Sequence, residues 1–261
     1  MNKLSSEFEK KGYKIQKLLD VKFIKNTQKL IKSSKHTKNI KQNIFDIEAL
    51  KLQSKLFQNS IHLKIIHNEE NFFKNLLNVK SLDDLCISSF FHLRAVRSEK
   101  KKNNFVGLHR ETFYNEHKYT KHQINISVPL LNYHKKNSMK IISGSHKILE
   151  KELKIKKINS EESGIKKGST KHKLGLPYNP KLIVSGINPK KARRVDCQPG
   201  KIIVFSAMLI HGGGDNLSSI PRYSIDFALI KKKFIKNKKI KIHHISYSKS
   251  KKYWIDIPKI I

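Results

Sequence analysis

Apolar and polar residues alternate along several segments of the chain from residue 123 onward, which is typical of β-strands. In the segment 123–130, Ile124 and Ile126 fall on one side while Asn125 and Ser127 fall on the other, because side chains two apart in a strand share a face. A polar face is the usual outside of a sheet. If it instead lines the interior of a barrel, its amides would contact a small polar ligand, and the pattern alone leaves both alternatives open.

Two later segments also have strand patterns. The segment 202–210 is apolar except for Ser206, a composition typical of a buried strand, and it follows a Pro-Gly turn and ends at His211 before a glycine-rich loop. The segment 222–229 alternates with period two, which places Arg222 and Ser224 on one face. A guanidinium fork beside a hydroxyl suits bidentate binding of a carboxylate.

The segment 1–84 shows helical rather than strand spacing. Its apolar residues recur at the intervals expected for amphipathic helices, and the segment 81–84 has the composition of a helix cap. We expect this part to brace the outer face of a barrel. The residues that show the spacing most clearly are Phe45, Ile47, Leu50, Leu52 and Leu56.

A long insert interrupts the strands at residues 147–200. It is rich in Lys, Ser, Gly and Pro, and its length is unusual for a connection, which suggests a lid or a substrate loop. Within it, Arg193 and Arg194 either face an anionic group or form a plain surface pair. Residues 231–261 have the composition of a basic C-terminal strand or tail.

The segment His109-Arg110-Glu111 carries the most specific chemistry. A histidine and a carboxylate two apart, joined by one distant histidine such as His211, are the ligands of the facial triad that holds non-haem Fe(II). The preceding apolar stretch 105–108 predicts a strand that runs into a loop. On an extended chain, side chains two apart share a face about 7 Å apart. Glutamate is long enough to bring its oxygen back toward the imidazole, so both donors can reach one ion.

The same spacing occurs at His67 and Glu69, so the motif alone is about as frequent as chance predicts. That copy lies among apolar residues at roughly helical spacing, and on a helix side chains two apart point about 200° away from each other. We therefore interpret it as solvated helix surface. What distinguishes the copy at His109 is His211 at a strand end and Arg222 on the following alternating strand.

The order of these residues resembles that of a known family, the phytanoyl-CoA dioxygenase-like Fe(II)/2-oxoglutarate-dependent oxygenases. The resemblance covers about residues 85–230 and implies a mainly β fold with flanking helices. That fold is a double-stranded β-helix, a cupin-like jelly-roll barrel, with the N-terminal helical brace outside it. The matching pieces, in order, are His109-x-Glu111, Val128-Pro129-Leu130, Ser143-Gly144-Ser145-His146-Lys147, Pro199-Gly200-Lys201, His211, Asn216 and Arg222.

The resemblance also implies the site and the reaction. His109, Glu111 and His211 match the catalytic iron ligands. Arg222 matches the residue that pairs with the distal carboxylate of the cosubstrate 2-oxoglutarate, and Ser224 and Asn125 are our further candidates for binding it. The implied enzyme is an oxidoreductase, a dioxygenase that consumes dioxygen and 2-oxoglutarate and releases succinate and CO2. Hydroxylation is favoured over halogenation, because relatives that halogenate leave the carboxylate position empty for halide.

The chain departs from the family pattern at three positions. Glu111 stands where the family more often has aspartate, which alters the reach of the ligand. Gly213 stands where family members often supply a hydroxyl for the cosubstrate, and Ser224 is the residue that would compensate. Ser143 replaces the usual proline before Gly-Ser-His, a minor change in the rigidity of the turn.

Substrate contacts are less clearly marked. The segment 92–97 predicts an early barrel strand with Arg94 and Arg97 on opposite faces, so at most one lines the cavity, and Arg97 is our candidate. Tyr114, near the metal motif, is a candidate contact and an equally good core aromatic. Similarity to a subgroup found with carbohydrate and antibiotic-sugar biosynthesis implies a sugar-like or other small polar metabolite as substrate.

The net charge of +35 introduces an alternative from another class. Such a field attracts phosphates, so a non-catalytic nucleic-acid-binding or scaffold barrel is retained as the second hypothesis. It is not favoured, because basic residues occur along the whole length, only six of the 55 are arginine, and no recognised nucleic-acid motif appears. The adjacent pair His243-His244 would point to opposite faces of a strand, so no second metal site is expected there.

Length and composition favour one soluble domain over residues 1–261. With 38% hydrophobic residues the chain can bury a substantial core. The first residues contain no secretory apolar segment, and the longest apolar run, of nine residues, is too short to span a bilayer. We expect a cytoplasmic protein without membrane contact. Cys86 and Cys197 have no metal or redox spacing and are expected to be reduced and structural.

Overall fold

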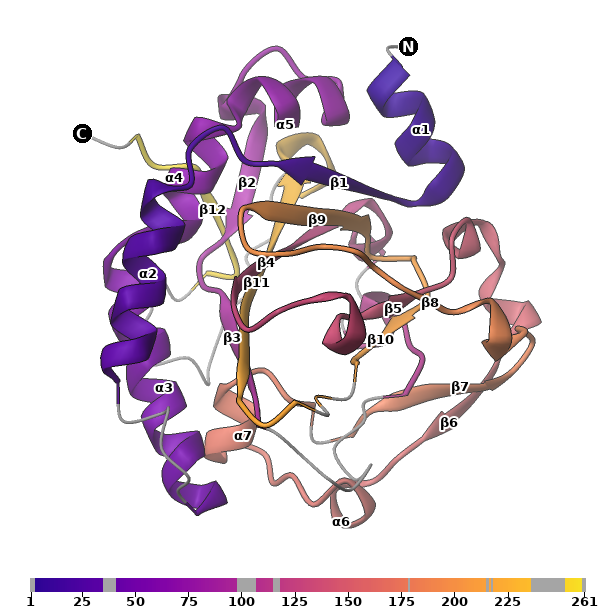
Figure 1. The fold of residues 1–261 in the computed structure, drawn as a ribbon. Coiled ribbons are helices and arrows are strands. Elements are labelled where there is room, and N and C mark those ends of the chain that lie inside the picture. The colour runs from indigo at the N-terminus through magenta and orange to yellow at the C-terminus, as the bar shows by residue number, and fades with distance from the viewer. Residues whose placement is uncertain are drawn as a thin grey trace.

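The structure is a computed structural model that describes residues 3–34, 41–97, 107–114, 118–177, 179–214, 216, 218–235 and 252–259. Its strands form two sheets and a separate hairpin, with the helices α2, α3 and α4 gathered on one side (Figure 1). The helices are α1 Lys3–Lys11, α2 Lys22–Ser33, α3 Gln42–Gln58, α4 Ile61–Asn68, α5 Glu70–Leu77, α6 Ser160–Ser163 and α7 Thr170–Lys173. The strands are β1 Tyr13–Lys17, β2 Leu85–Ser88, β3 His92–Val96, β4 Ile124–Leu131, β5 Lys140–Ile141, β6 Lys154–Lys157, β7 Lys181–Ser185, β8 Arg193–Arg194, β9 Lys201–Ser206, β10 His211–Gly212, β11 Arg222–Lys231 and β12 Trp254–Asp256.

The two sheets are antiparallel and pack on each other. The larger sheet has seven strands in the order β1-β9-β4-β11-β2-β12, with β3 pairing with β11 off this path, and the smaller sheet has the order β10-β5-β8. One apolar cluster joins them, because it contains Met139 and Ile141 from the smaller sheet's segment together with Ile203 and Phe205 of β9. Antiparallel sheets packed face to face confirm the predicted jelly-roll architecture.

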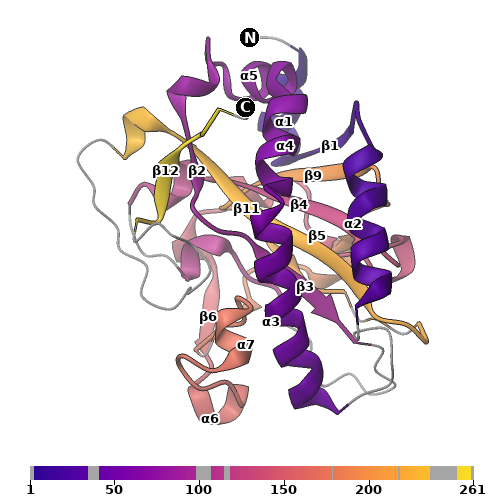
Figure 2. The ribbon, with the colours of Figure 1, turned by 90° about the vertical axis from the view of Figure 1, so that its left-hand side faces the viewer.

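The helices α2, α3, α4 and α5 form a helical layer that covers the outer face of the larger sheet (Figure 2). Apolar side chains of β4 and β11, such as Ile126 and Ile225, share one cluster with those of α2, α3, α4 and α5. The predicted helical brace is therefore confirmed. One strand within the N-terminal part was not expected: β1 pairs antiparallel with β9 and extends the larger sheet.

Helix α3 shows why apolar spacing predicts burial only approximately. Phe45, Ala49, Leu52 and Leu56 follow one another at intervals of three or four residues and are each at most 5% exposed. Ile47, which was predicted to belong to this set, is 46% exposed. It lies two positions after Phe45 and therefore points to the opposite side of the helix.

The polar face of β4 is buried, which decides between the two alternatives left open by its pattern. Ile124, Ile126 and Val128 pack in the cluster under the helices, so Asn125 and Ser127 point to the other side of the sheet. These two polar residues are 7% and 5% exposed. The polar face therefore lines the space between the sheets rather than the outside of the molecule.

The apolar run 202–210 is not a single strand, contrary to the prediction. Strand β9 ends at Ser206, and the amide of Leu209 donates to the Ser206 carbonyl at 2.8 Å to close a turn. The chain then enters the smaller sheet as β10, so His211 begins a new strand instead of ending β9. The sequence did not mark the reversal because Ala207, Leu209 and Ile210 are themselves fully buried.

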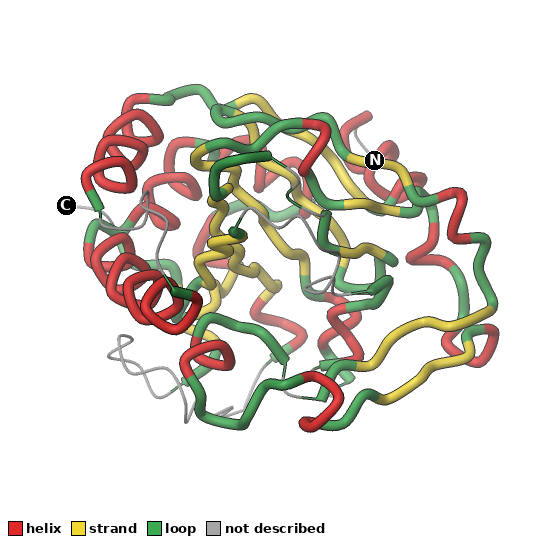
Figure 3. The backbone as a smooth tube through the Cα atoms, turned by 60° about the horizontal axis from the view of Figure 1, so that its bottom comes forward, coloured by secondary structure: helices red, strands yellow, loops and turns green. Residues whose placement is uncertain are grey.

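The insert 147–200 is folded rather than a bare loop. It contains the antiparallel β6–β7 hairpin, α6, α7 and β8, and the hairpin lies on the opposite side of the strands from the helical layer (Figure 3). The amide of Ile183 donates to the Leu108 carbonyl at 2.9 Å. Arg94 Nη1 donates to the Gly175 carbonyl at 2.8 Å. The insert is therefore attached to the strand β3 and to the segment that precedes His109.

Parts of three predictions lie outside the described residues. These are the apolar stretch at 105–106, the pair His243-His244, and most of the basic C-terminal segment, of which β12 is seen pairing with β2. The remaining residues 107–108 of the apolar stretch form no strand. Within the described ranges, every helix is too short or too polar to cross a lipid bilayer.

Candidate metal and cosubstrate site

Two ligand-bearing segments meet through their backbones between the sheets. His109 and His211 form an isolated antiparallel bridge, in which each amide donates to the other residue's carbonyl at 2.9 and 3.0 Å. The amide of Glu111 donates to the Ala207 carbonyl at 3.1 Å, where a 3-10 turn, Glu111–Phe113, begins. The bridge and this bond fix the His-x-Glu motif against the turn that precedes β10.

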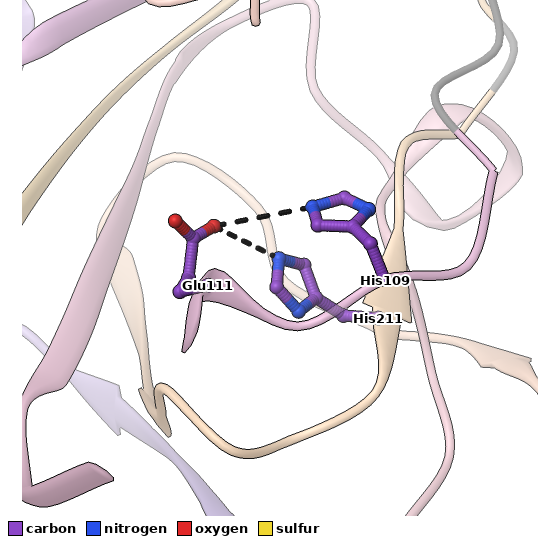
Figure 4. A group of neighbouring side chains, drawn as sticks. All are labelled: His109, Glu111 and His211. Carbon is purple, nitrogen blue, oxygen red and sulfur yellow. Dashed lines mark ion pairs between the residues drawn. The ribbon is translucent and has the colours of Figure 1, made fainter. Parts of the chain in front are cut away.

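The three candidate ligands converge on one point (Figure 4). Glu111 Oε1 lies 3.2 Å from His211 Nε2 and 4.0 Å from His109 Nε2, and all three ligand atoms lie within 4.8 Å of one another. Adjacent ligands of a metal ion with bonds of about 2.1 Å are about 3 Å apart. Two imidazole nitrogens and one carboxylate oxygen at these separations fit a 2-His-1-carboxylate metal centre after a small contraction.

Backbone carbonyls orient both imidazoles for this role. His109 Nδ1 lies 2.8 Å from the Gly107 carbonyl, and His211 Nδ1 lies 3.0 Å from the Leu209 carbonyl. Because a carbonyl oxygen only accepts, each Nδ1 carries the proton and donates it. The lone pair is then on Nε2, the atom that faces Glu111, as is usual for metal-binding histidines.

The electrostatics keep the ligands in the protonation states that bind metal. Burial and the neighbouring His211 lower the pKa of His109 to about 4, although the charge of Glu111 opposes the shift. Burial raises the pKa of Glu111, but the hydrogen bond and charge of His211 and the charge of His109 outweigh it and bring that pKa to about 2. At neutral pH the centre therefore offers a neutral His109 imidazole and an ionised carboxylate.

Arg222 lies at the start of β11 and is 6% exposed. Its Nη2 donates to the Gly214 carbonyl at 3.1 Å, and its guanidinium lies 5.1 Å from the ring centre of Tyr133. Its Nε has no hydrogen-bond partner, and within the described ranges no carboxylate forms an ion pair with it. Since a buried guanidinium is costly without a counterion, this arrangement fits a bound anion such as the far carboxylate of 2-oxoglutarate.

The other two candidates for binding the cosubstrate share the interior with Arg222. Ser224 is 2% exposed and lies two residues along β11 from Arg222, on the same face. Asn125 pairs in register with Phe205, whose ring lies 4.8 Å from that of His211. Asn125 accepts a bond of 2.6 Å from Gln123, while its own Nδ2 has no partner. An amide donor is therefore unused near the metal ligands.

The structure places the two substrate candidates differently. Tyr114 lies beside the metal ligands, with its ring 5.3 Å from that of His109 and its hydroxyl without a hydrogen-bond partner. Arg97 is not brought to the site: its guanidinium lies 5.6 Å from the ring centre of Phe45 in α3. Of the two arginines on this strand segment, Arg94 is the one that faces inward.

Sequence reasoning set Arg94 aside, although it lies closer to the chemistry. It pairs in register with Ser224, and its Nε donates to Asp226 Oδ2 at 2.8 Å. Its positive charge is also among the causes that lower the pKa of Glu111. The signal that would have identified it is the pairing of β3 with β11, which puts Arg94 on the Arg222 face.

The second His-x-Glu copy makes separate contacts. His67 Nε2 lies 2.8 Å from the Pro258 carbonyl, whereas Glu69 accepts from the Leu19 amide at 2.5 Å. The two side chains therefore have different partners within the fold. Glu69 is only 1% exposed, however, so the prediction of a solvated helix surface was wrong for it. The two cysteines are buried free thiols.

Solved structures with a similar fold include enzymes described as non-heme and one that was crystallised with 2-oxoglutarate. EvdO2 from Micromonospora carbonacea var. aurantiaca, complexed with 2-oxoglutarate, matches with a TM-score of 0.59 and 11% identity, over 88% of this chain and 91% of that one. The apo form of the non-heme monooxygenase ThoJ matches with a TM-score of 0.55 and 14% identity, over 87% and 77%. SnoN, a non-heme alpha ketoglutarate dependent epimerase from nogalamycin biosynthesis, matches with a TM-score of 0.52 and 12% identity, over 87% and 79%.

No curated protein matches the chain. The family model for phytanoyl-CoA dioxygenase matches residues 3–224, a range that includes every candidate ligand and Arg222. Together with the donor set of the triad, this match confirms the predicted oxidoreductase class and the predicted cofactors, iron and 2-oxoglutarate. The chain belongs to the phytanoyl-CoA dioxygenase family.

Proposed function

We propose that the protein is an Fe(II)- and 2-oxoglutarate-dependent dioxygenase that hydroxylates a small polar metabolite in the cytoplasm. The observation that carries the proposal is the convergence of His109, Glu111 and His211, with both Nδ1 atoms bonded to backbone carbonyls. Side chains that only stabilise the fold would not be expected to direct two Nε2 lone pairs and a carboxylate at one point. The residues 1–261 act as one domain in this proposal.

Each residue has a defined part in the proposed reaction. His109, Glu111 and His211 hold the iron, while Arg222 neutralises the far carboxylate of 2-oxoglutarate. Bound iron, 2-oxoglutarate and dioxygen together supply the oxidising power, with succinate and CO2 as the co-products. The protein provides orientation and excludes water. Hydroxylation is the proposed outcome because Glu111 fills the position that a halide would need.

Ser224 and Asn125 complete the proposed cosubstrate site. Ser224 brings a hydroxyl beside the Arg222 guanidinium on the same face of β11. Asn125 contributes its unpartnered Nδ2 as a hydrogen-bond donor from the adjacent strand β4. These two groups would bind oxygen atoms of 2-oxoglutarate that the guanidinium does not reach.

The proposed substrate side consists of Tyr114 and Arg94, the latter taking the part predicted for Arg97. Arg94 is already paired with Asp226, so the pair offers no net charge to an ionic substrate. Asp226 Oδ1 and the Tyr114 hydroxyl are buried without hydrogen-bond partners. An acceptor and a hydroxyl of this kind suit a substrate with hydroxyl groups, such as a sugar-like molecule.

The proposal is tested by anaerobic addition of Fe(II) and 2-oxoglutarate. A weak visible charge-transfer band should appear, and it should be abolished in His109→Ala and in His211→Ala. The matched control is His67→Ala, which removes the histidine of the second His-x-Glu copy and should leave the band unchanged. Absence of the band from the unaltered chain, together with absence of succinate formation, would overturn the proposal.

A further inference from the structure

The middle residue of the metal motif, Arg110, is the largest fully buried side chain in the described part of the molecule, with 0% of its surface exposed. Its backbone is extended, so its side chain points away from the side on which its two neighbours bind metal. Arg110 Nη2 donates to the carbonyls of Ser145 and Ile148, at 2.7 and 2.8 Å. The guanidinium therefore ties the motif to the Gly-Ser-His segment behind it.

Ser145 continues this connection to the other ligand segment. Its Oγ accepts from the amide of Ile210 at 2.8 Å, and Ser145 itself is 2% exposed. The amide of Ile142 donates to the Ile210 carbonyl at 2.9 Å. Both backbone groups of Ile210, the residue before His211, are thus held by the segment 142–145.

These bonds close a ring around the two histidines. From Arg110 the ring passes through Ser145 to Ile210, then along the chain to His211, and returns through the backbone bridge between His211 and His109. Every link that is not covalent is a hydrogen bond of 3.0 Å or less. The relative placement of the two ligand segments is therefore fixed from both sides, by the bridge in front and by Arg110 and Ser145 behind.

We propose that Arg110 and Ser145 are positioning residues of the metal centre, forming a rear clamp that sets the distance between His109 and His211 before metal binds. The inference rests on the proposed function for the identity of the metal, but not for the geometry.

The free-energy cost of burying the Arg110 guanidinium favours a positioning role over a purely stabilising one. A fully buried guanidinium loses its hydration, and here it meets carbonyl oxygens while Nε and Nη1 have no partners. An apolar side chain of similar volume would fill the same space without that penalty. What an apolar side chain lacks is a directional bond that joins the motif to Ser145.

The clamp also reaches the insert. Ile148 is the second residue of the segment 147–200, and its carbonyl is one of the two acceptors of Arg110. The root of the insert and the metal motif are therefore bonded to the same guanidinium. Two groups outside the ligand set, Arg110 and Ser145, thus hold three chain segments in one arrangement.

The test compares two buried serines that make the same kind of bond. Ser145→Ala removes the acceptor of the Ile210 amide. The control, Ser88→Ala, removes the acceptor of the Ala228 amide, a bond of 3.1 Å in the larger sheet, and Ser88 is 1% exposed. The readouts are the melting temperature, the affinity for Co(II) measured against a chelator, and the visible spectrum of bound Co(II). Ser145→Thr, which keeps the hydroxyl, serves as the rescue variant.

We expect Ser145→Ala to lower the affinity for Co(II) about 10-fold to 100-fold, the range typical of groups that orient metal ligands, and to alter the Co(II) spectrum. Ser88→Ala should lower the melting temperature by a similar amount and leave affinity and spectrum unchanged. Ser145→Thr should recover most of the affinity. In the metal-free chain, amide exchange should accelerate at His109 and His211 in Ser145→Ala but not in the control.

Arg110→Met tests the other half of the clamp, because it keeps volume and removes the donor. It should reproduce the spectral change of Ser145→Ala. The proposal is overturned if Ser145→Ala and Arg110→Met bind Co(II) with unchanged affinity and spectrum. It is also overturned if Ser88→Ala weakens metal binding as much as Ser145→Ala does. A chain that binds Co(II) but neither binds nor consumes 2-oxoglutarate would refute the proposed function while leaving the clamp intact.

Discussion

Gly213 is the residue at which this chain departs most usefully from the family pattern. A side chain built there would meet nothing within 4 Å, so the hydroxyl that relatives often supply two residues after the distal histidine has room but is missing. Ser224, on the Arg222 face of β11, is the residue that would replace it. A hydroxyl introduced at position 213 therefore shows whether 2-oxoglutarate is bound better by two hydroxyl groups than by that of Ser224 alone.

Gly213→Ser should fold normally and raise the affinity for 2-oxoglutarate about fivefold, the equivalent of one net hydrogen bond of about 1 kcal/mol. This affinity is measured by titrating the protein with 2-oxoglutarate and following the charge-transfer band. The control is Gly214→Ser, because a Cβ at Gly214 would lie 1.9 Å from the Ser138 carbonyl, and it should be strongly destabilised. Unchanged affinity in a folded Gly213→Ser would show that Ser224 already fills the role.

At the scale of elements, the helical layer contains a titratable group with no charged partner in the described contacts. His62 of α4 stacks on Phe57 with ring centres 5.1 Å apart, and lies 5.4 and 6.0 Å from the rings of Phe91 and Phe227. Its Nδ1 has no hydrogen-bond partner, and burial lowers its pKa to about 4. The folded layer therefore accepts His62 only as neutral imidazole.

Acid should destabilise the fold through this residue. An unfolded histidine has a pKa of about 6.5, so between pH 6.5 and 4 the unfolded state binds more protons than the folded state and the free energy of unfolding decreases. The loss should reach about 2 kcal/mol by pH 5. His62→Phe removes the titrating group and keeps an aromatic ring. Denaturant unfolding at pH 7 and pH 5 should therefore show a decrease in the free energy of unfolding that is smaller by about 2 kcal/mol in the variant. Equal losses in both proteins would contradict the assignment.

The insert approaches β3 closely at Gly175. Gly175 has a φ of +85°, and a Cβ there would lie 2.4 Å from the His92 ring, whereas Gly168 has a φ of +78° with nothing within 4 Å. Both Gly175→Ala and Gly168→Ala introduce backbone strain of about 1–2 kcal/mol, but only the former clashes with β3. Gly175→Ala should also displace the carbonyl that accepts from Arg94.

Limited tryptic digestion distinguishes these two variants, because the insert is rich in lysine. Gly175→Ala should be cleaved within 160–176 several-fold faster than the unaltered chain, since local opening sets the rate. Gly168→Ala should lower the melting temperature without comparable acceleration. If both variants are cleaved at the same rate, the contact with His92 does not secure the insert.

The elements also show which features the sequence could predict. Period-two alternation identified β4 and β11, and with them the shared face of Arg222 and Ser224, because alternation is a property of one strand. It could not show whether Arg94 or Arg97 faces inward, since that depends on the pairing of β3 with β11. The short strand β1 was missed for the same reason: its pairing with β9 defines it.

The candidate site was predictable as a set of residues and not as a geometry. The ordered His109, Glu111, His211 and Arg222 pointed to the same family that the chain matches. That His211 opens β10 rather than ending β9 was not predictable, because the turn before it is buried and therefore apolar. Arg110 gave no signal of its role, since a charged residue inside a motif is expected to be solvated rather than fully buried.

At the scale of the whole molecule, the charge of +35 must be reconciled with an enzyme of a small substrate. Basic residues outnumber acidic ones by 55 to 20, and a field of this size attracts any polyanion over about a Debye length, about 8 Å at physiological salt. Near the site, in contrast, few charges are present: Arg94 is paired with Asp226, and the Arg222 guanidinium is left for the cosubstrate carboxylate. The excess charge therefore belongs to the surface rather than to the proposed chemistry.

This separation predicts how the protein should behave toward nucleic acid. Binding to double-stranded DNA should be independent of sequence and should weaken steeply with salt, because it arises from counterion release; a protein that makes six to ten phosphate contacts loses about 10³-fold to 10⁵-fold between 50 and 200 mM salt. His211→Ala should bind DNA as the unaltered chain does, since the triad lies between the sheets and is buried at both histidines. Fluorescence anisotropy across a salt series measures both effects. Tight binding that persists at high salt or selects a sequence would instead favour the nucleic-acid-binding alternative, because only contacts beyond the phosphate backbone survive screening.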